Sequence, residues 1–472
     1  MILALAGLLL PAVAAWWVLR AMRLRVPGDS RILAAAVAGA LGIGASSLVT
    51  FATVFLEVFP GPVFVVADAS LWSILCLAAW WRTRGRVAEP EAAPHVGPAR
   101  EWTAADWLVR AACVAVVAAS FAVPVIEYLK SPHGQWDAWA IWNQKARFLF
   151  RAGDGWTASM SIPWSQPGHP LLVSLSVARL WAYAGAELTA VPAVLSGVYG
   201  AITVAIVMGA LDVGRTRAWV AGAVLVAPFA FSHLASAQTA DLPFGMFVVA
   251  SLAMLRQDDP PAWRQPGRAR SALLLAGALG GLSAWTKNEG AVFLVASSCL
   301  VARVTLRHAR WQDAAWWMGG VAPLAALVAY FKLVLMPILP EYVSGASGST
   351  LIEQVTSIAR HAAVLELVSP MWLPWGGPWA RGSILVVLAA ALVSSMSPTG
   401  HSARGTLAVV AVMIGGYYIA YVLTTLDLRW MVATSFERLV MQLWPALVMA
   451  ALSVGQVDLR DSARVAFAQG ER

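Results

Sequence analysis

The sequence predicts an all-α fold: a polytopic bundle of about 13 transmembrane helices, with amphipathic juxtamembrane helices in a large outer loop. Hydrophobic residues make up 59% of the 472 residues and charged residues only 12%, whereas soluble proteins carry about 25% charged residues. The mean hydropathy is +0.69. Apolar stretches of about 20 residues, the length that crosses a bilayer, follow one another along the chain.

The first apolar stretch begins at Met1 and has neither a basic segment before it nor a small-residue cleavage site. We therefore interpret it as an anchor and not as a removed signal peptide. The spans are predicted at about 1–19, 32–54, 62–81, 107–128, 189–211, 216–234, 242–256, 271–286, 289–304, 314–335, 383–397, 406–426 and 439–456.

Arginine and lysine indicate which loops are cytoplasmic, because short cytoplasmic loops are enriched in these residues. The arginines of alternate loops are Arg20, Arg23, Arg25 and Arg31, then Arg82, Arg84, Arg86 and Arg100, then Arg215 and Arg217, then Arg256, Arg264, Arg268 and Arg270, then Arg303, Arg307 and Arg310, and then Arg404. This assignment places the N-terminus and two long loops, about 129–188 and 336–382, outside. Residues 170–185 contain Arg179 and are too short for a crossing, so we expect a helix packed at the outer surface.

The pattern divides the chain into three parts. Residues 1–104 hold N-terminal transmembrane helices and a cytoplasmic linker, 105–335 form a core with the outer loop 129–188, and 336–472 hold a second outer loop and C-terminal helices. Cys76, Cys113 and Cys299 lie in apolar stretches without a CxxC pairing, which argues against disulfide or metal roles.

The outer loop contains a tryptophan-rich amphipathic helix that begins near Asp137. Its apolar residues recur at helical spacing, and the other face carries Asn143, Arg147 and Arg151. Such a helix lies in the membrane interface. Asp137 could act as a helix N-cap, as a general base that takes a proton from an acceptor hydroxyl, or as both. Asp154, between two glycines, is typical of a turn.

Further polar residues fall on the outer side in this topology. His169 precedes a proline and could bind substrate or cap the turn. Asp241 stands at the mouth of a span, where a carboxylate is costly unless it is paired or functional. Lys287 and Glu289 lie in a very short connection and could pair with each other or face an anionic ligand.

Arg429 and Arg438 break the charge rule on the outer side, which favours phosphate recognition over interfacial snorkelling. Together with Lys145 and the other lysines they predict a positive outer pocket, suited to a phosphorylated lipid. Asp137 and Asp241 could also share a divalent cation, Mg²⁺ or Mn²⁺.

These motifs together resemble the GT-C superfamily of membrane glycosyltransferases, and are similar to its protein O-mannosyltransferase and aminoarabinose transferase branch. The matching elements are Asp137 in the first outer loop, His169-Pro170 at a helix entry, Ala240-Asp241-Leu242-Pro243 and Thr286-Lys287-Asn288-Glu289-Gly290. Two departures are Ala138-Trp139 after the first acid and Leu171 after His169-Pro170. Three spans, where the family commonly has one, precede the loop.

The resemblance implies a polyprenyl-phosphate-linked sugar as donor and inverting transfer to an acceptor glycan, lipid or protein. It implies a bacterial inner membrane protein whose active site faces the periplasm, and it matches Asp137, His169-Pro170, Asp241 and Lys287 to the family's motifs. Together with the positions of the other charged residues, this predicts Asp137 and Asp241 as catalytic residues. The predicted substrate-binding residues are Lys145, His169, Lys287, Glu289, Arg429 and Arg438. Neither a nucleic acid nor a nucleotide sugar is expected. The alternatives are a transporter or flippase of lipid-linked or small anionic substrates, and a non-catalytic scaffold.

Overall fold

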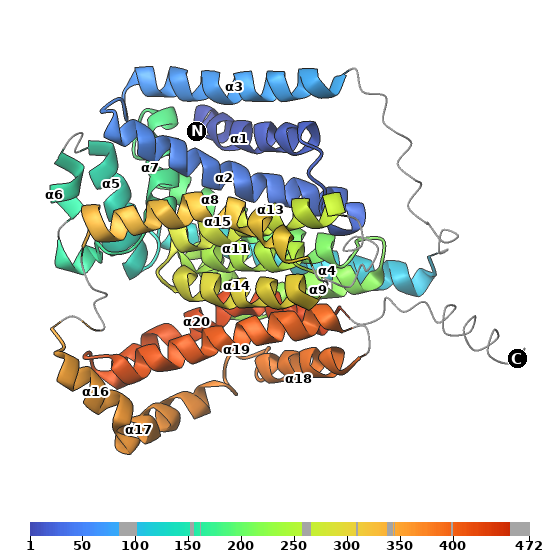
Figure 1. Cartoon of the computed structure of the whole chain (residues 1–472), viewed down its shortest axis with the longest axis vertical. Coiled ribbons are helices and arrows are strands. Elements are labelled where there is room, and N and C mark those ends of the chain that lie inside the picture. Colours follow the sequence, from blue (N-terminus) through green and yellow to red (C-terminus); the bar gives the residue numbers. More distant parts are fainter. Residues whose placement is uncertain are drawn as a thin grey trace, which may run out of the picture.

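The computed structural model describes residues 1–84, 102–151, 155–160, 162–256, 266–307, 310–337, 343, 345–397 and 400–453. Within these ranges every regular element is helical, as the all-α prediction requires. Asp154, most of the cytoplasmic linker and part of the second outer loop lie outside the described residues. The helices run side by side, and α5, α6, α16 and α17 gather at one end of the bundle (Figure 1).

The N-terminal helices form a group of their own. It consists of α1 (Ile2–Ala21), the short turn η1 (Pro27–Asp29), α2 (Arg31–Phe55) and α3 (Pro62–Arg84), with α1 packed on both α2 and α3. The next helix, α4 (Ala104–Lys130), begins with a capping box in which Thr103 and Asp106 bond each other's backbone N–H groups.

The first outer segment folds into short helices. They are the π-helical turn η2 (Ala138–Trp142), α5 (Asn143–Arg151), α6 (Trp156–Met160), the turn η4 (Pro163–Ser165) and α7 (Leu172–Ala184). The segment 170–185 forms a helix that is not among the candidate spans, as predicted, but its expected surface position was wrong. Residues 172–183 are all buried, against α1, α2, α5 and α8. Arg179 enters this core because Asp68 of α3 accepts from its Nε at 3.1 Å and the Gly7 carbonyl from Nη1 at 2.7 Å.

The central helices surround α11 (Asp241–Met254), all of whose residues are buried. A helix that is apolar on every side is typical of such a core position. Around it lie α8 (Ala190–Ala210), α9 (Thr216–Val226) and α10 (Phe229–Ser236), with a 69° bend between the last two. The others are α13 (Pro266–Thr286), α14 (Glu289–Arg307), η5 (Trp311–Asp313), α15 (Ala314–Tyr330) and the π-helical turn η6 (Phe331–Leu335).

The C-terminal part begins with α16 (Gly348–Thr356), α17 (Ile358–Val368) and the turn η8 (Ser369–Met371). Three longer helices follow: α18 (Ser383–Met396), α19 (His401–Leu423) and α20 (Leu428–Ala451). The last of these packs on α11 and carries polar residues along its first half. This contact brings the last described helix to the middle of the bundle.

Among the described residues, eight helices are long and apolar enough to cross a membrane, or nine if α9 and α10 form one bent span. They are α1, α2, α3, α4, α8, α14, α15 with its flanking turns, and α19. This number indicates a multi-pass membrane protein. The apolar helices α7, α11 and α18 are shorter, and the count of about 13 spans stays a prediction.

Candidate functional site

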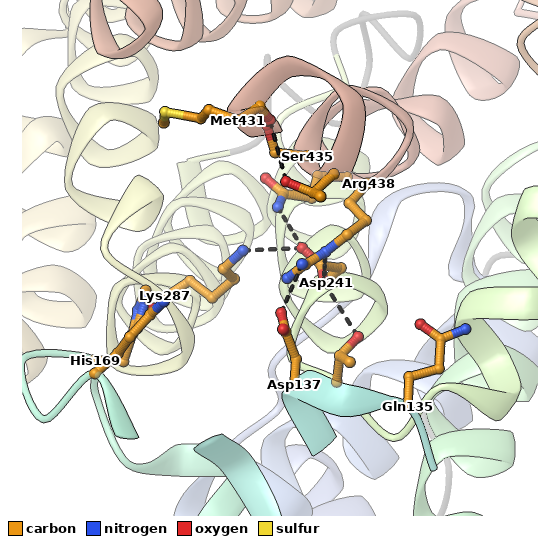
Figure 2. Close-up of polar contacts among 12 residues, drawn as sticks. Gln135, Asp137, His169, Asp241, Lys287, Met431, Ser435 and Arg438 are labelled. Atoms are coloured by element: carbon orange, nitrogen blue, oxygen red, sulfur yellow. Dashed lines mark hydrogen bonds and ion pairs between the residues drawn. The ribbon is translucent and has the colours of Figure 1, made fainter. Parts of the chain in front are cut away.

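A cluster of charged side chains lies where the outer segment meets α11, the α13–α14 connection and α20. Figure 2 shows Asp137, Asp241, Lys287 and Arg438 pointing toward one another. Asp137 comes from the outer segment, Asp241 from the first residue of α11, and Arg438 from α20. The structure therefore brings together residues that are far apart in the sequence, and the cluster includes both predicted acids.

Asp241 is the fully buried centre of this cluster. Its Oδ1 accepts from Lys287 Nζ at 2.9 Å and from Gln442 Nε2 at 2.8 Å. Its Oδ2 accepts from Arg438 Nε at 2.9 Å and from Thr239 Oγ1 at 3.1 Å. The side chain has 0% exposure, and such burial of a carboxylate is tolerated only with partners of this kind. Both oxygens are therefore committed to protein donors.

Arg438 joins the two predicted acids. Its Nη1 lies 2.6 Å from Asp137 Oδ2, and its Nε bonds Asp241. The guanidinium thus occupies the space between the carboxylates that a shared divalent cation would need. Among the described residues, no group of three or more His, Cys, Asp and Glu side chains is arranged to hold a metal ion. The Mg²⁺ or Mn²⁺ hypothesis gains no support from this geometry.

Asp137 keeps part of its carboxylate accessible, with a side-chain exposure of 22%. It does not act as an N-cap, because its backbone is already helical and its side chain accepts no capping hydrogen bond. The preceding Gly134 has φ +76°, and a Cβ there would lie 2.9 Å from the Ala237 carbonyl oxygen. Only glycine allows this close turn, which leads the chain directly into Asp137.

Two hydrogen bonds fix the Asp137 segment to the loop before α11. Gln135 N donates to the Ala237 carbonyl at 3.3 Å, and Asn143 Nδ2 donates to Gln238 Oε1 at 2.9 Å. Asn143 is buried, although the sequence pattern placed it on the polar face of the amphipathic helix. The base candidate is therefore held by backbone and side-chain contacts on a rigid support.

Lys287 lies between two carboxylates in the two-residue connection of α13 and α14. Its Nζ is 2.9 Å from Asp241 Oδ1 and 2.8 Å from Glu289 Oε1. Burial by itself would lower the pKa of Lys287, but the charges of Asp241 and Glu289 outweigh it and raise the pKa, so the ammonium stays protonated. Glu289 uses only one oxygen here, and its Oε2 is buried without a hydrogen-bond partner.

The segment Gln166–His169 is held by two lysines through its backbone. Lys145 Nζ donates to the carbonyls of Gln166 at 2.6 Å and His169 at 3.5 Å. Lys332 Nζ donates to the Gly168 carbonyl and, at 2.5 Å, to Asn288 Oδ1. Lys145 thus contacts protein backbone in this structure, and its role as a substrate ligand stays a prediction. Burial and the charge of Lys332 hold the pKa of Lys145 well below its usual range.

His169 faces the same cluster and is uncharged. Burial and then the positive charges of Lys145, Lys287, Lys332 and Arg438 hold the pKa of His169 well below its usual range. Its Nε2 lies 2.5 Å from Gln166 Oε1, whereas Nδ1 is buried without a partner. The ring also packs against Trp142, with ring centroids 5.3 Å apart.

Two arginine groups on the outer side do not reach the cluster. Arg429 is exposed in the first turn of α20, more than two helical turns before Arg438. Arg147 and Arg151 pair with Glu187 at 3.5 and 2.5 Å. The predicted positive pocket is therefore smaller than expected, and its cations are Lys145, Lys287, Lys332 and Arg438.

Sequence reasoning did not select Gln442, Thr239 or Asn288 for the site, and it counted Lys332 only among the lysines of the positive outer pocket. Gln442 could have been found from its spacing, because it lies one helical turn after Arg438 and so shares its face. Lys332 and Asn288 give no such local signal, since their meeting depends on how α15 packs. Comparison of the whole chain with models of protein families, with curated proteins and with solved structures found no match.

Proposed function

We propose that this chain is a membrane glycosyltransferase that moves a sugar from a polyprenyl-phosphate donor to an acceptor hydroxyl at the outer face. One observation carries the proposal. A partly exposed carboxylate, Asp137, is held 2.6 Å from Arg438, and Arg438 is fixed in turn by the fully buried Asp241. A carboxylate beside fixed cations, at the end of a bundle of apolar helices, is what a base and a phosphate site for this reaction require. The resemblance of the sequence motifs to GT-C enzymes supports the same reaction.

The reaction is a single displacement. Asp137 takes the proton of the acceptor hydroxyl while the acceptor oxygen forms a bond to the anomeric carbon of the sugar. The bond from that carbon to the phosphate oxygen breaks, and the lipid phosphate leaves with the electron pair. Because bond formation and bond breaking occur on opposite faces, the configuration at the anomeric carbon inverts.

The leaving phosphate needs nearby cations, and Lys287 and Arg438 are the candidates. Fixed positive charge in a site of low water content stabilises developing negative charge strongly. Asp241 then serves as a positioning residue, because its two oxygens hold Lys287 and Arg438 at 2.9 Å each. This role differs from the catalytic one that the motif comparison implied for Asp241, and it follows from the absence of a free oxygen on its carboxylate.

The test measures transfer from a radiolabelled polyprenyl-phosphate sugar pool in membranes. Asp137→Asn should lower transfer at least about 100-fold with the protein folded and inserted, because a positioned base contributes roughly 10²–10⁴ in rate. Asp212→Asn is the matched control, since Asp212 has 56% side-chain exposure and contacts only its close neighbours in the sequence, Arg215 and the backbone N–H of Gly214, among the described residues. Transfer by Asp137→Asn at the control rate would exclude Asp137 as the base.

Inside the bundle, the acid Asp68 gives no support to the transporter alternative. Asp68, the acid within a predicted span, bonds Arg179, Tyr183 Oη at 2.7 Å and Trp72 Nε1 at 3.0 Å. A carboxylate so occupied offers no open position to a passing ion. Movement of a labelled lipid-linked sugar across the liposome membrane, without transfer to any acceptor, would nevertheless favour the transporter alternative.

A further inference from the structure

Among the buried polar atoms of the described residues that have no hydrogen-bond partner, two are acceptors near the lysines of the cluster: Glu289 Oε2 and His169 Nδ1. Buried polar atoms in folded proteins are nearly always bonded, so an open one requires an explanation. Neither belongs to the chain of contacts from Asp137 through Arg438 and Asp241 to Lys287. They are therefore positions that the reaction scheme above leaves unused.

The two atoms lie on segments that Lys332 connects. Lys332 Nζ bonds Asn288, the neighbour of Glu289, and also bonds the carbonyl of Gly168, the neighbour of His169. Figure 2 shows His169 beside Lys287, whose ammonium contacts Glu289 Oε1 at 2.8 Å. Both open atoms thus border the region next to the cations that would hold the donor phosphate.

Both open atoms are acceptors. His169 Nε2 contacts Gln166 Oε1, an oxygen that can only accept, so Nε2 carries the ring proton and Nδ1 is the bare nitrogen. The free oxygen of the Glu289 carboxylate accepts as well. A ligand that satisfies the two positions must therefore present two donors, either hydroxyl groups or an amine.

The charges around His169 favour hydroxyl groups over a charged amine as the donors. Burial, and then the positive charges of Lys145, Lys287, Lys332 and Arg438, disfavour the protonated form of His169. A ligand ammonium that donated to His169 Nδ1 would meet the same burial and the same four cations. Hydroxyl groups carry no charge, can donate to both acceptors, and leave the cations to the phosphate.

We propose that Glu289 and His169 recognise two hydroxyl groups of the transferred sugar, so that the donor carries a neutral, hydroxylated sugar and not an amino sugar. The inference rests on the proposed function. It separates the two kinds of donor that the resembling branch leaves open, a hexose such as mannose and an aminopentose.

The first experiment measures binding of three lipids to the full-length protein in nanodiscs. They are polyprenyl phosphate, polyprenyl-phosphate hexose and polyprenyl-phosphate 4-amino-4-deoxypentose. We expect the hexose donor to bind at least about tenfold more tightly than the bare phosphate, the size of one or two hydrogen bonds to a charged or buried acceptor. The amino sugar should gain nothing over the bare phosphate. Equal or tighter binding of the amino sugar would overturn the proposal.

The second experiment assigns the hydroxyls with variants and single-deoxy hexose donors. His169→Phe keeps the ring against Trp142 and removes Nδ1, and Glu289→Gln removes the carboxylate charge. Each variant should lose affinity for the hexose donor but become insensitive to the removal of one particular hydroxyl, a pattern that a merely structural role would not produce. The exposed Glu366→Gln on α17 is the control. If a variant weakens the binding of the hexose donor and of the bare phosphate to the same extent, the assignment is wrong.

The two proposals fail separately. If the wild-type protein consumes no donor, with water or any acceptor, the glycosyltransferase proposal is wrong. If it consumes the amino-sugar donor in preference to the hexose donor, the transferase stands and only the assignment of the sugar is wrong.

Discussion

Asp137 and Asp241 both contact Arg438, but the two carboxylates differ in burial and therefore suit different roles. Asp241 has no exposed surface and four donors, whereas Asp137 has 22% exposure and contacts Arg438 through one oxygen. A buried carboxylate between two cations supports structure, because its loss leaves uncompensated charge in the interior. A partly exposed carboxylate is free to meet a substrate. Substitutions of the two aspartates should therefore differ in their effect on stability, although both should lower activity.

Asp241→Asn should destabilise the protein, and Asp137→Asn should not. Breaking a buried ion pair costs about 3–5 kcal/mol, whereas a partly exposed pair contributes about 1 kcal/mol or less. Thermal unfolding in nanodiscs checks the difference, and both variants should lose transfer. Equal melting temperatures for the two variants would show that Asp241 does not hold the cluster together.

The protonation state of His169 gives a prediction about pH. Burial and then the nearby positive charges lower the pKa of His169 well below its usual range, so that the folded protein disfavours its protonated form. Below about pH 6.5 the unfolded chain takes up a proton that the folded protein refuses. The lowered pKa of His169 thus contributes nothing to the free energy of unfolding above about pH 6.5. It lowers the free energy of unfolding as the pH falls from there toward the pKa of the folded state. Unfolding measured from pH 7 to 5 should show a smaller loss of stability in His169→Phe.

The residues of the site were predictable from the sequence only in part. Asp137, Asp241, Lys287 and Arg438 stand out because charge on the outer side of an apolar chain is rare and costly. Their separate roles depend on burial, which a single sequence does not reveal. Lys145 was expected at a ligand, yet it bonds the carbonyls of Gln166 and His169, a long-range contact without any local pattern.

At the scale of elements, two glycines set how α13 and α15 approach. A Cβ on Gly320 would lie 2.3 Å from the Leu274 carbonyl oxygen, and one on Gly277 would lie 2.4 Å from the Trp317 carbonyl oxygen. Small residues allow helix backbones to pack closely in membranes. The packing also sets the position of Lys332, which follows α15 in η6.

Gly320→Ala should therefore push α13 and α15 apart and destabilise the protein by about 1–3 kcal/mol, as overpacking does. Gly319→Ala is the control in the same helix, because its Cβ would meet only Leu274 Cδ1 at 3.7 Å, an ordinary contact. Thermal unfolding compares the two variants. A Gly320→Ala protein as stable as Gly319→Ala would contradict the close contact.

Helical periodicity predicted where helices occur better than how they pack. The apolar stretches predicted α1 to α4 within a few residues, because length and hydropathy suffice for a spanning helix. The placement of 170–185 failed for a physical reason. Arg179 argued against a membrane crossing, but its burial in the core depends on Asp68 and the Gly7 carbonyl, which are far away in the sequence and satisfy its guanidinium.

At the scale of the whole molecule, the predicted orientation places the charged cluster outside. In this prediction the loop arginines mark the cytoplasmic end, and α16 and α17 lie at the same end of the bundle as α5 and α6 (Figure 1). The three natural cysteines lie within α3, α4 and α14. An impermeant maleimide can therefore report the sides of the membrane from single introduced cysteines.

Glu366→Cys on α17 should react with an impermeant maleimide added to intact cells or spheroplasts. Gln312→Cys, exposed in η5 at the other end, should react only after the membrane is opened. A cysteine-free background removes any signal from Cys299, which is exposed on α14. The reverse labelling pattern would place the cluster on the cytoplasmic side and contradict a periplasmic active site.

The buried contact between Arg179 and Asp68 has a consequence for biosynthesis. An arginine on a short apolar helix is costly in lipid without a partner. The position of α7 therefore requires that Asp68 and the Gly7 carbonyl are already in place to bond Arg179. These partners belong to α1 and α3, which the ribosome completes first. The three N-terminal helices thus supply the partners of Arg179 before α7 is made, and we expect α7 to lack these partners in a chain that begins after α3.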